Sequence, residues 1–438
     1  MKPVSIGILG LGTVGSGTAR VLKLNADEIA RRAGRKIKVS HAAVRTLGGE
    51  SKVGTEHTHI TDNALAVVNS TEVDIVVELI GGESPAHELV MQAIENGKHV
   101  VTANKALIAR YGNEIFAAAQ AKGVVVAFEA AVAGGIPIIK AIREGLSANQ
   151  INWIAGIING TGNFILTEMR DKGRDFSDVL KEAQQLGYAE ADPTFDVEGI
   201  DAAHKLCILS SIAFGIPLQF EKVYTEGISK ISQQDVMYAS RLGYRIKHLG
   251  FTRSTAKGIE MRVHPTLIPE KCLIANVDGV MNAVLVQADM LGQSLYYGAG
   301  AGSDPTASAV VADIIDVTRS LTTDLDNRVP HLAFQPDQIN DTPILPMNDV
   351  KTSYYLRLKV EDKPGVMAEI SEIMGNKKIS IEAILQTEPV VGDSSANIIM
   401  LTQRVFELQM DQAISEIIKL KSVSGNIQRI RVENLQEY

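Results

Sequence analysis

Residues 4–15 have the sequence VSIGILGLGTVG, in which a mostly apolar hexamer leads into three closely spaced glycines. The hexamer, residues 4–9, predicts a buried strand because it is a short apolar run that ends at a turn signal. Residues 13–33 then have the helical spacing of apolar side chains, up to Gly34, a residue typical of helix ends. The chain therefore begins with a strand, a glycine turn and a helix.

The three glycines of this turn have the spacing GxGxxG. Gly10 permits the tight turn, Gly12 lets the backbone approach a pyrophosphate, and Gly15 allows the helix to pack closely on the strand. The N–H groups at the helix N-terminus then form an anion site. The sequence thus predicts dinucleotide binding, and the alternative is a glycine-rich turn without a ligand.

Arg45 stands where the next predicted strand, residues 37–44, ends. NAD-binding domains usually carry Asp or Glu at this point to hold the ribose 2′-hydroxyl. The forked guanidinium of an arginine instead matches the geometry of a 2′-phosphate. We therefore expect NADP(H) to be favoured over NAD(H), with a plain surface arginine as the alternative.

Strands and helices alternate through the first 140 residues, which is typical of an α/β fold with a parallel, doubly wound sheet. The further apolar runs are residues 73–80, 98–102 and 124–128, and the helical segments are 86–96 and 111–122. The pattern predicts a Rossmann-like dinucleotide-binding domain over residues 1–140.

The remaining chain is predicted to form two further domains. Residues 141–303 mix strands and helices, which indicates an α+β domain. This domain is separately expected to serve substrate binding, catalysis and dimerisation, and the helix at 304–320 is expected to complete the first domain. Four prolines among Asp and Asn mark residues 321–350 as a linker. Residues 351–434 follow the order βαββαβ, which predicts a ferredoxin-like domain.

Composition excludes several classes of protein. The 438 residues are 45% hydrophobic and 21% charged, as in globular proteins, and the net charge of −8 argues against nucleic acid as a partner. The two cysteines lack the CxxC spacing of a zinc or disulfide framework. The N-terminus has no apolar export segment, and the longest uncharged run, residues 145–167, contains four asparagines. We expect a cytoplasmic protein with no membrane span.

Asp201 and Lys205 carry the strongest chemical signal. They are four residues apart, and so share one face of a helix whose next residues, LCILSSIAF, are apolar. A lysine at the start of such a helix is partly desolvated, and a neighbouring carboxylate holds its charge, so it can donate a proton to an oxygen that gains negative charge. The alternative is a surface salt bridge beside a solvated acidic loop.

Two further segments follow predicted strands. Lys105 comes after the strand at 98–102, at the carboxyl edge where open α/β sheets bind ligands; the alternative is a mere N-terminal charge on the next helix. Glu129 begins the bend EAAVAGGIP, residues 129–137, whose carboxylate and carbonyl oxygens suit a hard cation, although these residues alone favour a tight domain crossover.

Two tempting features are interpreted as structural. His57 and His59 have no third ligand nearby in a polar stretch, which favours a solvent-facing loop over a metal site. Cys207 lies within an apolar helix without a histidine placed to activate it, which favours a buried thiol.

Several spaced motifs together resemble homoserine dehydrogenases that carry a C-terminal ACT regulatory domain. The resemblance covers nearly the whole chain. The resembling segments are GILGLGTVG (7–15), TANKALIA (102–109), FEAAVAGGIPII (128–139), GIINGTGNFIL (156–166), GYAEADPTFDVEGIDAAHKLCIL (187–209), GAGAGSDPTA (298–307) and EDKPGVMAEIS (361–371).

The resemblance implies the reversible reduction of L-aspartate 4-semialdehyde to L-homoserine by a nicotinamide cofactor, in threonine, methionine and isoleucine biosynthesis. By motif position, Lys205 is expected to be the acid–base residue and Asp201 to orient it or a water. Lys105 is expected to bind and polarise the reacting group. Glu190 and Asp196 are expected to hold the amino end of the substrate, since an ammonium group needs carboxylates.

The resemblance also implies a cofactor site and a sodium site. The residues expected to touch the cofactor, besides the glycine turn, are Thr13, Val14, Arg45, Lys105 and Gly302. The structural sodium ion is expected on the Glu129 carboxylate and on the main-chain carbonyls of Val132, Gly134 and Ile136.

The motif KVEDKPGV, residues 359–366, resembles the turn of an ACT domain, which binds an amino acid between paired modules. Asp362, Gly365 and Val366 are the expected regulatory positions. The resemblance implies L-threonine as a feedback inhibitor and a homodimer or homotetramer, with a merely structural dimerising module as the alternative.

Two other functions compete with this interpretation. One is an amino-acid sensor whose nucleotide domain has lost catalysis, against which the retained Lys105, Glu190, Asp201 and Lys205 argue. The other is an aldehyde dehydrogenase with a cysteine nucleophile, for which neither cysteine is well placed. Because the first strand begins at residue 4, with no aspartate kinase segment before it, we expect a monofunctional enzyme.

Overall fold

The computed structural model describes residues 2–48, 54–321, 328–386 and 395–435. The chain forms two compact units, each made of three segments. The first unit comprises Met1–Gly160, Asp201–Val223 and Val280–Thr342, and the second comprises Thr161–Ile200, Tyr224–Gly279 and Pro343–Tyr438. Each unit is described separately. No helix in the described ranges is both long enough and apolar enough to cross a membrane.

The first unit contains a six-stranded sheet in the order β3-β2-β1-β4-β5-β6, and every pairing in it is parallel. The strands are β1 (Val4–Leu9), β2 (Ile37–Ala43), β3 (His59–Thr61), β4 (Ile75–Glu78), β5 (His99–Thr102) and β6 (Val126–Ala127). The order reverses at β1, as in dinucleotide-binding folds. The predicted Rossmann-like sheet is confirmed.

The single helix predicted over residues 13–33 is wrong. Two helices, α1 (Thr13–Leu24) and α2 (Ala26–Ala33), meet at Asn25, whose φ of −107° and ψ of 21° lie outside the helical range. Asparagine readily leaves helical geometry because its side chain competes for backbone hydrogen bonds. The apolar spacing continued through the break and therefore hid it.

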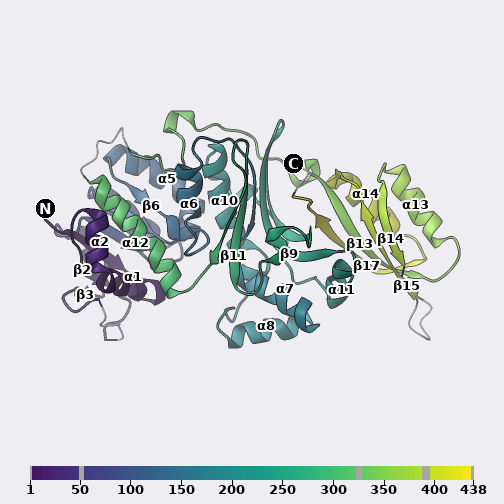
Figure 1. Ribbon diagram of the computed structural model, residues 1–438, viewed down its shortest axis with the longest axis horizontal. Helices are drawn as coiled ribbons and strands as arrows, with labels where there is room; N and C mark the ends of the chain where they lie inside the picture. The colour runs from purple at the N-terminus through teal and green to yellow at the C-terminus, as the bar shows by residue number, and fades with distance from the viewer. Residues whose placement is uncertain (1, 49–53, 322–327, 387–394, 436–438) are drawn as a thin grey trace. The chain divides into compact units, whose positions relative to one another are not determined.

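Helices cover the sheet. The strand β3 and the helix α3 were not predicted, because each is very short. The helices are α3 (Ala64–Asn69), α4 (Ala86–Glu95), α5 (Lys105–Lys122), α6 (Ile138–Lys140) and α12 (Ser303–Ser320). Figure 1 shows α12 alongside α1, although almost 300 residues separate them, and buried side chains of α12 join the core of the sheet. Gly17 of α1 makes this approach possible, because a Cβ there would lie 2.5 Å from the Ser303 hydroxyl.

The first unit also holds three antiparallel strands, β7 (Ile151–Ile157), β11 (Met281–Ala288) and β12 (Gly292–Ala299), and the helix α10 (Ile200–Phe214). Residues 201–213 of α10 are all buried. A helix buried on every side must satisfy any charge on it internally. Asp201 and Lys205, in the first two turns of α10, therefore need partners inside the protein. These partners lie in the candidate active site.

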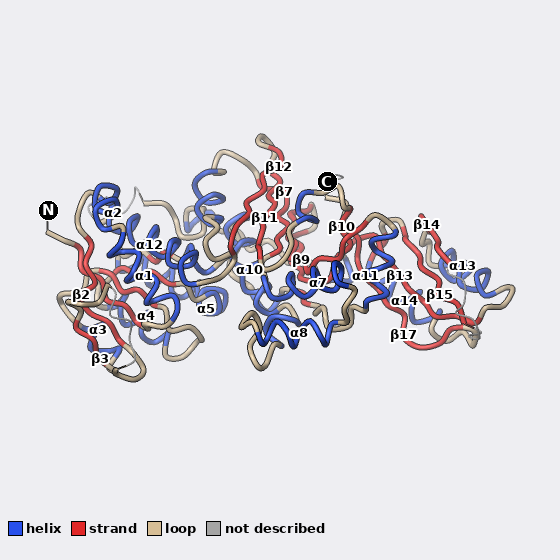
Figure 2. The backbone as a smooth tube through the Cα atoms, turned by 60° about the horizontal axis from the view of Figure 1, so that its bottom comes forward, coloured by secondary structure: helices blue, strands red, loops and turns tan. Residues whose placement is uncertain are grey.

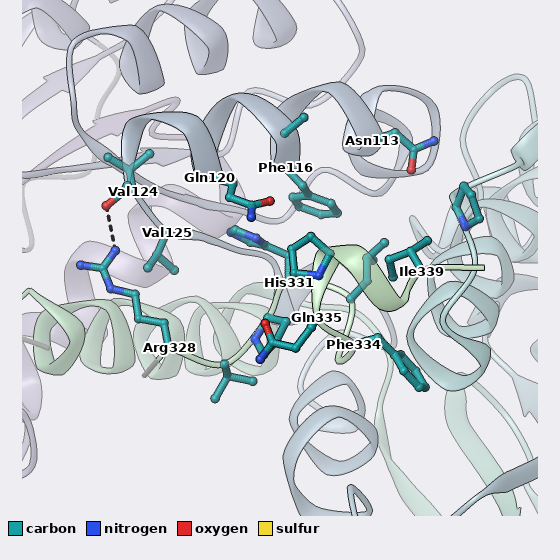
Figure 3. Close-up of a pocket in the computed structure, with 17 residues that line it drawn as sticks. Asn113, Phe116, Gln120, Val124, Val125, Arg328, His331, Phe334, Gln335 and Ile339 are labelled. Atoms are coloured by element: carbon teal, nitrogen blue, oxygen red, sulfur yellow. Dashed lines mark hydrogen bonds between the residues drawn. The ribbon is translucent and has the colours of Figure 1, made fainter. Parts of the chain in front are cut away.

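Residues 328–339 of the expected linker are ordered against α5 and enclose a cavity of about 720 Å³ (Figure 3). Arg328 fastens this segment by donating from Nη1 to the carbonyl oxygen of Gly123 at 2.8 Å. His331 stacks on Phe116, with 4.9 Å between ring centroids. The cavity adjoins the middle and C-terminal end of α5, whereas Lys105 begins that helix.

Two histidines near β6 make the first unit sensitive to acid. His331 Nε2 accepts the N–H of Val126 at 3.2 Å, and His99 Nδ1 accepts the N–H of Val125 at 3.0 Å. Burial lowers the pKa of each imidazole to about 4. Protonation would place a new imidazole N–H against a backbone N–H. The folded state therefore binds these protons only near pH 4, whereas the unfolded state binds them below about pH 6.5.

We therefore expect the free energy of unfolding to be fully retained above pH 6.5 and to fall as the pH drops toward 4. The expected loss is about 2 kcal/mol per histidine by about pH 5. Urea unfolding at neutral pH and at about pH 5 measures it. In the His331→Gln variant the difference between the two values should shrink by that amount, and an unchanged difference would contradict the assignment.

The second unit is built on a sheet in the order β9-β10-β17-β13-β15-β14. Figure 2 shows these strands with helices on both sides. The strands are β8 (Tyr224–Thr225), β9 (Tyr244–Thr255), β10 (Gly258–Pro269), β13 (Lys351–Glu361), β14 (Ile381–Gln386), β15 (Ser395–Thr402), β16 (Val405–Phe406) and β17 (Val423–Val432). The helices are α7 (Gly160–Lys172), α8 (Phe176–Gln185), α9 (Thr194–Val197), α11 (Gln233–Arg241), α13 (Val366–Asn376) and α14 (Glu407–Ile417).

The order of elements from β13 to β17 confirms the predicted βαββαβ module, with the two-residue β16 added. One face of its sheet buries apolar side chains against α13 and α14. The other face carries Tyr355, Ile399 and Ile430 into a core shared with α7, α8 and α11. The module is thus packed into the second unit on both faces.

Candidate active site

Asp201 and Lys205 lie one turn apart on α10 and form a buried ion pair. Lys205 Nζ donates to Asp201 Oδ2 at 2.7 Å and to the carbonyl oxygen of Ile158 at 2.7 Å. The two side chains are only 11% and 7% exposed. The alternative of a solvated surface salt bridge is therefore wrong.

Lys105 reaches the same carboxylate from the N-terminus of α5. Asn104 caps this helix by accepting the N–H of Leu107 at 3.1 Å, which fixes the position of the following lysine. Lys105 Nζ lies 3.2 Å from Asp201 Oδ1, and its side chain is one-third exposed. Asp201 therefore bridges two lysines, of which one is buried and one reaches solvent.

Asn159 completes the ring of donors, since its Nδ2 donates to Asp201 Oδ2 at 2.9 Å. Burial alone would raise the pKa of Asp201, but the charges of Lys205 and Lys105 and these hydrogen bonds outweigh it and hold that pKa well below its usual range. Asp201 is consequently ionised at every working pH. The arrangement presents a positioned ammonium group that can transfer a proton, supported by a second cation.

A buried polar cluster at the carboxyl ends of β4 and β5 escaped the sequence analysis. Glu78 accepts the N–H groups of Ile80 and Gly81 at 2.8 and 3.2 Å and the hydroxyl of Thr102 at 2.6 Å. Asn104 donates to the carbonyl oxygen of Gly82 at 2.6 Å. The cluster holds the two loops that flank Lys105. The available signal was Glu78 itself, the one acid that interrupts the apolar residues 75–80.

The glycine turn has the shape that a dinucleotide requires. Gly10 has a φ of +95°, and a Cβ on Gly15 would lie 1.9 Å from the Gly10 carbonyl oxygen, so neither position tolerates a side chain. A Cβ on Gly12 would meet nothing within 4 Å. The space before the N-terminus of α1 at Thr13 is therefore open, as the approach of a pyrophosphate demands.

Two predicted cofactor positions border this turn. The carbonyl oxygen of Ala43, the last residue of β2, accepts the N–H of Gly10 at 2.9 Å. Arg45 follows Ala43 by two residues and is exposed. Gly302, with a φ of +112°, caps α12, and the next residue, Ser303, donates its hydroxyl to the carbonyl oxygen of Thr13 at 2.9 Å. Residues far apart in sequence thus meet around the glycine turn, and Val14 follows within α1.

Glu129 is buried at the start of its loop. Its two carboxylate oxygens accept the N–H groups of Ile139 and Lys140, each at 2.8 Å, and its own N–H donates to Asp313 at 2.7 Å. Burial and the neighbouring Asp313 raise the pKa of Glu129 to about 7, while the N–H groups of Lys140 and Ile139 and the Lys140 charge lower it. Val132, Gly134 and Ile136 are buried in the same loop. A cation there would relieve the repulsion between the two carboxyl groups.

The two expected substrate carboxylates belong to the second unit. Asp196 is half-buried on α9, and Glu190 is exposed before it. Gln184 anchors the intervening loop by donating to the carbonyl oxygen of Glu190 at 3.1 Å. Asp192 Oδ1 accepts the N–H of Thr194, the first residue of α9, at 3.1 Å. These contacts give the acidic segment a defined conformation.

The expected regulatory turn opens α13. Gly365 has a φ of +94° and precedes the buried Val366, the first residue of the helix. Asp362 is exposed and accepts a 3.4 Å hydrogen bond from Gln386. The positive φ explains why the motif needs a glycine at this position.

Of the two features interpreted as structural, the buried thiol is confirmed, whereas the expected loop at His57 and His59 is wrong for His59. Cys207 is fully buried, and burial raises the pKa of its thiol to about 12, so it cannot serve as a nucleophile. His59 lies in β3 rather than in a loop, with its ring 5.6 Å from that of His41. Within the described residues, no three His, Cys, Asp or Glu side chains are grouped to hold a metal ion.

Comparison with known proteins agrees with this geometry. The family models for the homoserine dehydrogenase NAD-binding domain, for homoserine dehydrogenase and for the ACT domain match residues 10–129, 137–315 and 354–422. The homoserine dehydrogenase of Pseudomonas aeruginosa is 64% identical over 99% of this chain and 100% of its own length. The chain belongs to the homoserine dehydrogenase family.

Solved structures extend the likeness. A homoserine dehydrogenase from Thiobacillus denitrificans superposes with a TM-score of 0.95 at 65% identity, covering 99% of both chains. A hyperthermophilic archaeal homoserine dehydrogenase in complex with NADPH superposes with a TM-score of 0.61 at 28% identity, covering 72% of this chain and 98% of its own. As a homoserine dehydrogenase, the protein is an oxidoreductase that interconverts L-aspartate 4-semialdehyde and L-homoserine with a nicotinamide cofactor. It is neither a sensor without catalysis nor a thiol-dependent aldehyde dehydrogenase.

Proposed function

We propose that Lys205 is the proton donor of this homoserine dehydrogenase. The observation that carries the proposal is the buried Lys205–Asp201 ion pair with Lys105 on the other carboxylate oxygen. A nicotinamide cofactor bound at the glycine turn would supply the hydride that the aldehyde carbon accepts. Lys205 protonates the oxygen that gains charge, Asp201 orients the ammonium group, and Lys105 binds and polarises the reacting group.

The amino end of the substrate is proposed to bind Glu190 and Asp196. Their positions in the motif and the conformation of the acidic segment support this. The Gln184 bond to the Glu190 carbonyl oxygen and the Asp192 bond to the Thr194 N–H hold the segment that leads into α9, which carries Asp196. A substrate ammonium group is best recognised by carboxylates at such sites. We also propose that L-threonine binds at Asp362, Gly365 and Val366. Its binding to the ACT module would then inhibit the enzyme by feedback.

The cofactor is proposed to be NADP(H) in preference to NAD(H), bound by the glycine turn, Thr13, Val14, Lys105 and Gly302. Arg45 is exposed beyond the strand β2 that pairs with β1, which supports a contact with the 2′-phosphate. The solved structure of a hyperthermophilic archaeal homoserine dehydrogenase is in complex with NADPH, which is consistent with this choice. We also propose that a structural sodium ion binds at Glu129. The enzyme is further proposed to be a homodimer or homotetramer and to be cytoplasmic.

The Arg45→Ala variant tests the cofactor proposal. We expect its KM for NADPH to rise about tenfold while its KM for NADH stays unchanged, because only the phosphate contact is lost. Initial rates of L-aspartate 4-semialdehyde reduction with each cofactor measure both constants. Arg31→Ala, which removes an exposed arginine of α2, is the matched control. Equal changes with the two cofactors would refute the role of Arg45.

The same assay with millimolar L-threonine tests the regulatory proposal. Inhibition of the wild-type enzyme that disappears in Asp362→Ala would support it. Full activity at saturating threonine would leave the ACT module as a structural one.

A further inference from the structure

Arg431 of β17 is a buried cation with several partners inside the second unit. Its side chain is fully buried, and Nε donates to Glu407 Oε2 at 3.0 Å, within the ACT module. Nη1 donates to Glu226 Oε2 at 2.7 Å, and Nη2 donates to the Tyr224 hydroxyl at 3.1 Å. Glu226 and Tyr224 belong to the catalytic part of the chain, so one guanidinium joins the regulatory module to it.

The register of the sheet explains this meeting. Strand β9 pairs with β10 along its whole length, so β8 and β17 must both use the opposite edge of β10. Arg262 of β10 pairs with Tyr224, and Thr266 pairs with Arg431, four residues further along the same edge. The end of the ACT module therefore lies directly beyond β8.

Glu226 begins a short segment, residues 226–229, that is fixed to β9 and β10. Its N–H donates to the carbonyl oxygen of Val263 at 2.8 Å, and its own carbonyl oxygen lies 3.0 Å from His248 Nε2. Its carboxylate also accepts the hydroxyl of Tyr224 at 3.0 Å. The segment is thus held at one end by Arg431 and by the two strands.

The other end of the segment 226–229 holds the acidic helix α9. The N–H of Ile228 donates to the carbonyl oxygen of Val197 at 2.9 Å, and Ser229 donates its hydroxyl to Glu198 at 2.7 Å. Gly227 touches α9 so closely that a Cβ there would lie 2.7 Å from the Val197 carbonyl oxygen. Any shift of the segment must therefore move Val197, which is the neighbour of Asp196.

We propose that the Arg431–Glu226 ion pair is a positioning device that fixes the acidic helix α9, and with it Asp196, for substrate binding. The ACT module then forms part of the support of the substrate site, and the residues 226–229 are the connection. The inference rests on the proposed role of Asp196. It assigns Arg431 and Glu226 to positioning and not to contact with the substrate.

The Glu226→Gln variant is the principal test, because glutamine keeps the shape and the bond to Tyr224 but loses the charge. We expect the KM for L-homoserine to rise about fivefold, with kcat and the KM for NADP unchanged. Arg429→Gln is the matched control: Arg429 lies on the same strand and pairs with Glu407 at 3.1 Å, but has no bond to the segment 226–229 among the contacts of the described residues. Its KM for L-homoserine should stay within about twofold of the wild type.

Two further variants keep the test independent of general damage. Gly227→Ala places a Cβ against the Glu198 carboxylate and 2.7 Å from the Val197 carbonyl oxygen, so it should raise the same KM while leaving the Arg431–Glu226 pair intact. Arg431→Lys should retain part of the activity that an Arg431→Gln change loses. Thermal unfolding midpoints are measured for all variants. A loss of kcat in proportion to a lowered midpoint would overturn the positioning role.

Asp196→Asn separates this inference from the proposal on which it rests. If Asp196→Asn raises the KM for L-homoserine but Glu226→Gln leaves it within about twofold, the positioning role is wrong and the substrate assignment stands. If Asp196→Asn leaves that KM unchanged, the substrate assignment itself is wrong.

Discussion

Replacing Lys205 with alanine is expected to lower kcat about a thousandfold, because the oxygen that gains charge loses its proton donor. The buried ammonium group has no substitute on α10, and Lys105 approaches Asp201 from its other oxygen, 3.2 Å away. Binding of NADPH should persist, since the glycine turn around Gly12 lies at a different strand end. Single-turnover reduction of L-aspartate 4-semialdehyde and a fluorescence titration with NADPH measure the two quantities.

The control for this experiment is Lys122→Ala, which removes an exposed lysine that pairs with Glu95 at the end of α5. Its kcat should equal that of the wild type. Turnover of the Lys205→Ala protein within about tenfold of the wild-type value would remove Lys205 from the mechanism.

Replacing Asp201 with asparagine is expected to have the second-largest effect. The change leaves two ammonium groups facing a neutral amide in a buried site, and the loss of a partner from a buried ion pair destabilises a protein by about 3 kcal/mol. Because Lys205 also loses its orienting acceptor at 2.7 Å, kcat should fall about a hundredfold. Urea unfolding and initial rates measure the two losses.

The pH dependence of stability distinguishes Asp201 from an ordinary surface acid. The pKa of Asp201 is lower in the folded state than in the unfolded state. Its stabilising contribution is therefore present above the usual carboxyl range and is lost as the pH falls below that range toward the folded pKa.

The control for Asp201→Asn is Glu28→Gln, which removes an exposed partner of Arg31 and Arg32 and should lower the free energy of unfolding by less than about 1 kcal/mol. Equal losses in the two variants would show that Asp201 has no special role in the fold.

Local sequence signals predicted the chemistry on continuous elements. The glycine turn at 10–15, the alternation of the first sheet and the βαββαβ order needed only neighbouring residues, because turn geometry and apolar period are local properties. Asp201 and Lys205 were found for the same reason, since four residues make one helical turn. Asn25, which splits the predicted helix, shows what such local signals miss. The spacing of apolar residues does not reveal a single residue that leaves helical geometry.

Contacts between distant segments could not be predicted in this way. Lys105 and Asn159 reach Asp201 from other elements, and Arg431 reaches Glu226 across 205 residues. Such pairs depend on which strand edges meet, and residue patterns fix the direction and faces of a strand but not its neighbours.

The sequence by itself determined the elements, the glycine turn and the residue types available for proton transfer, because these follow from local backbone and side-chain chemistry. Only the tertiary structure decided that Lys205 is buried, that its carboxylate is shared with Lys105, and that the segment 226–229 joins β17 to α9. Burial and charge pairing arise when packed elements exclude water together, so they are properties of the assembled core and not of any one segment.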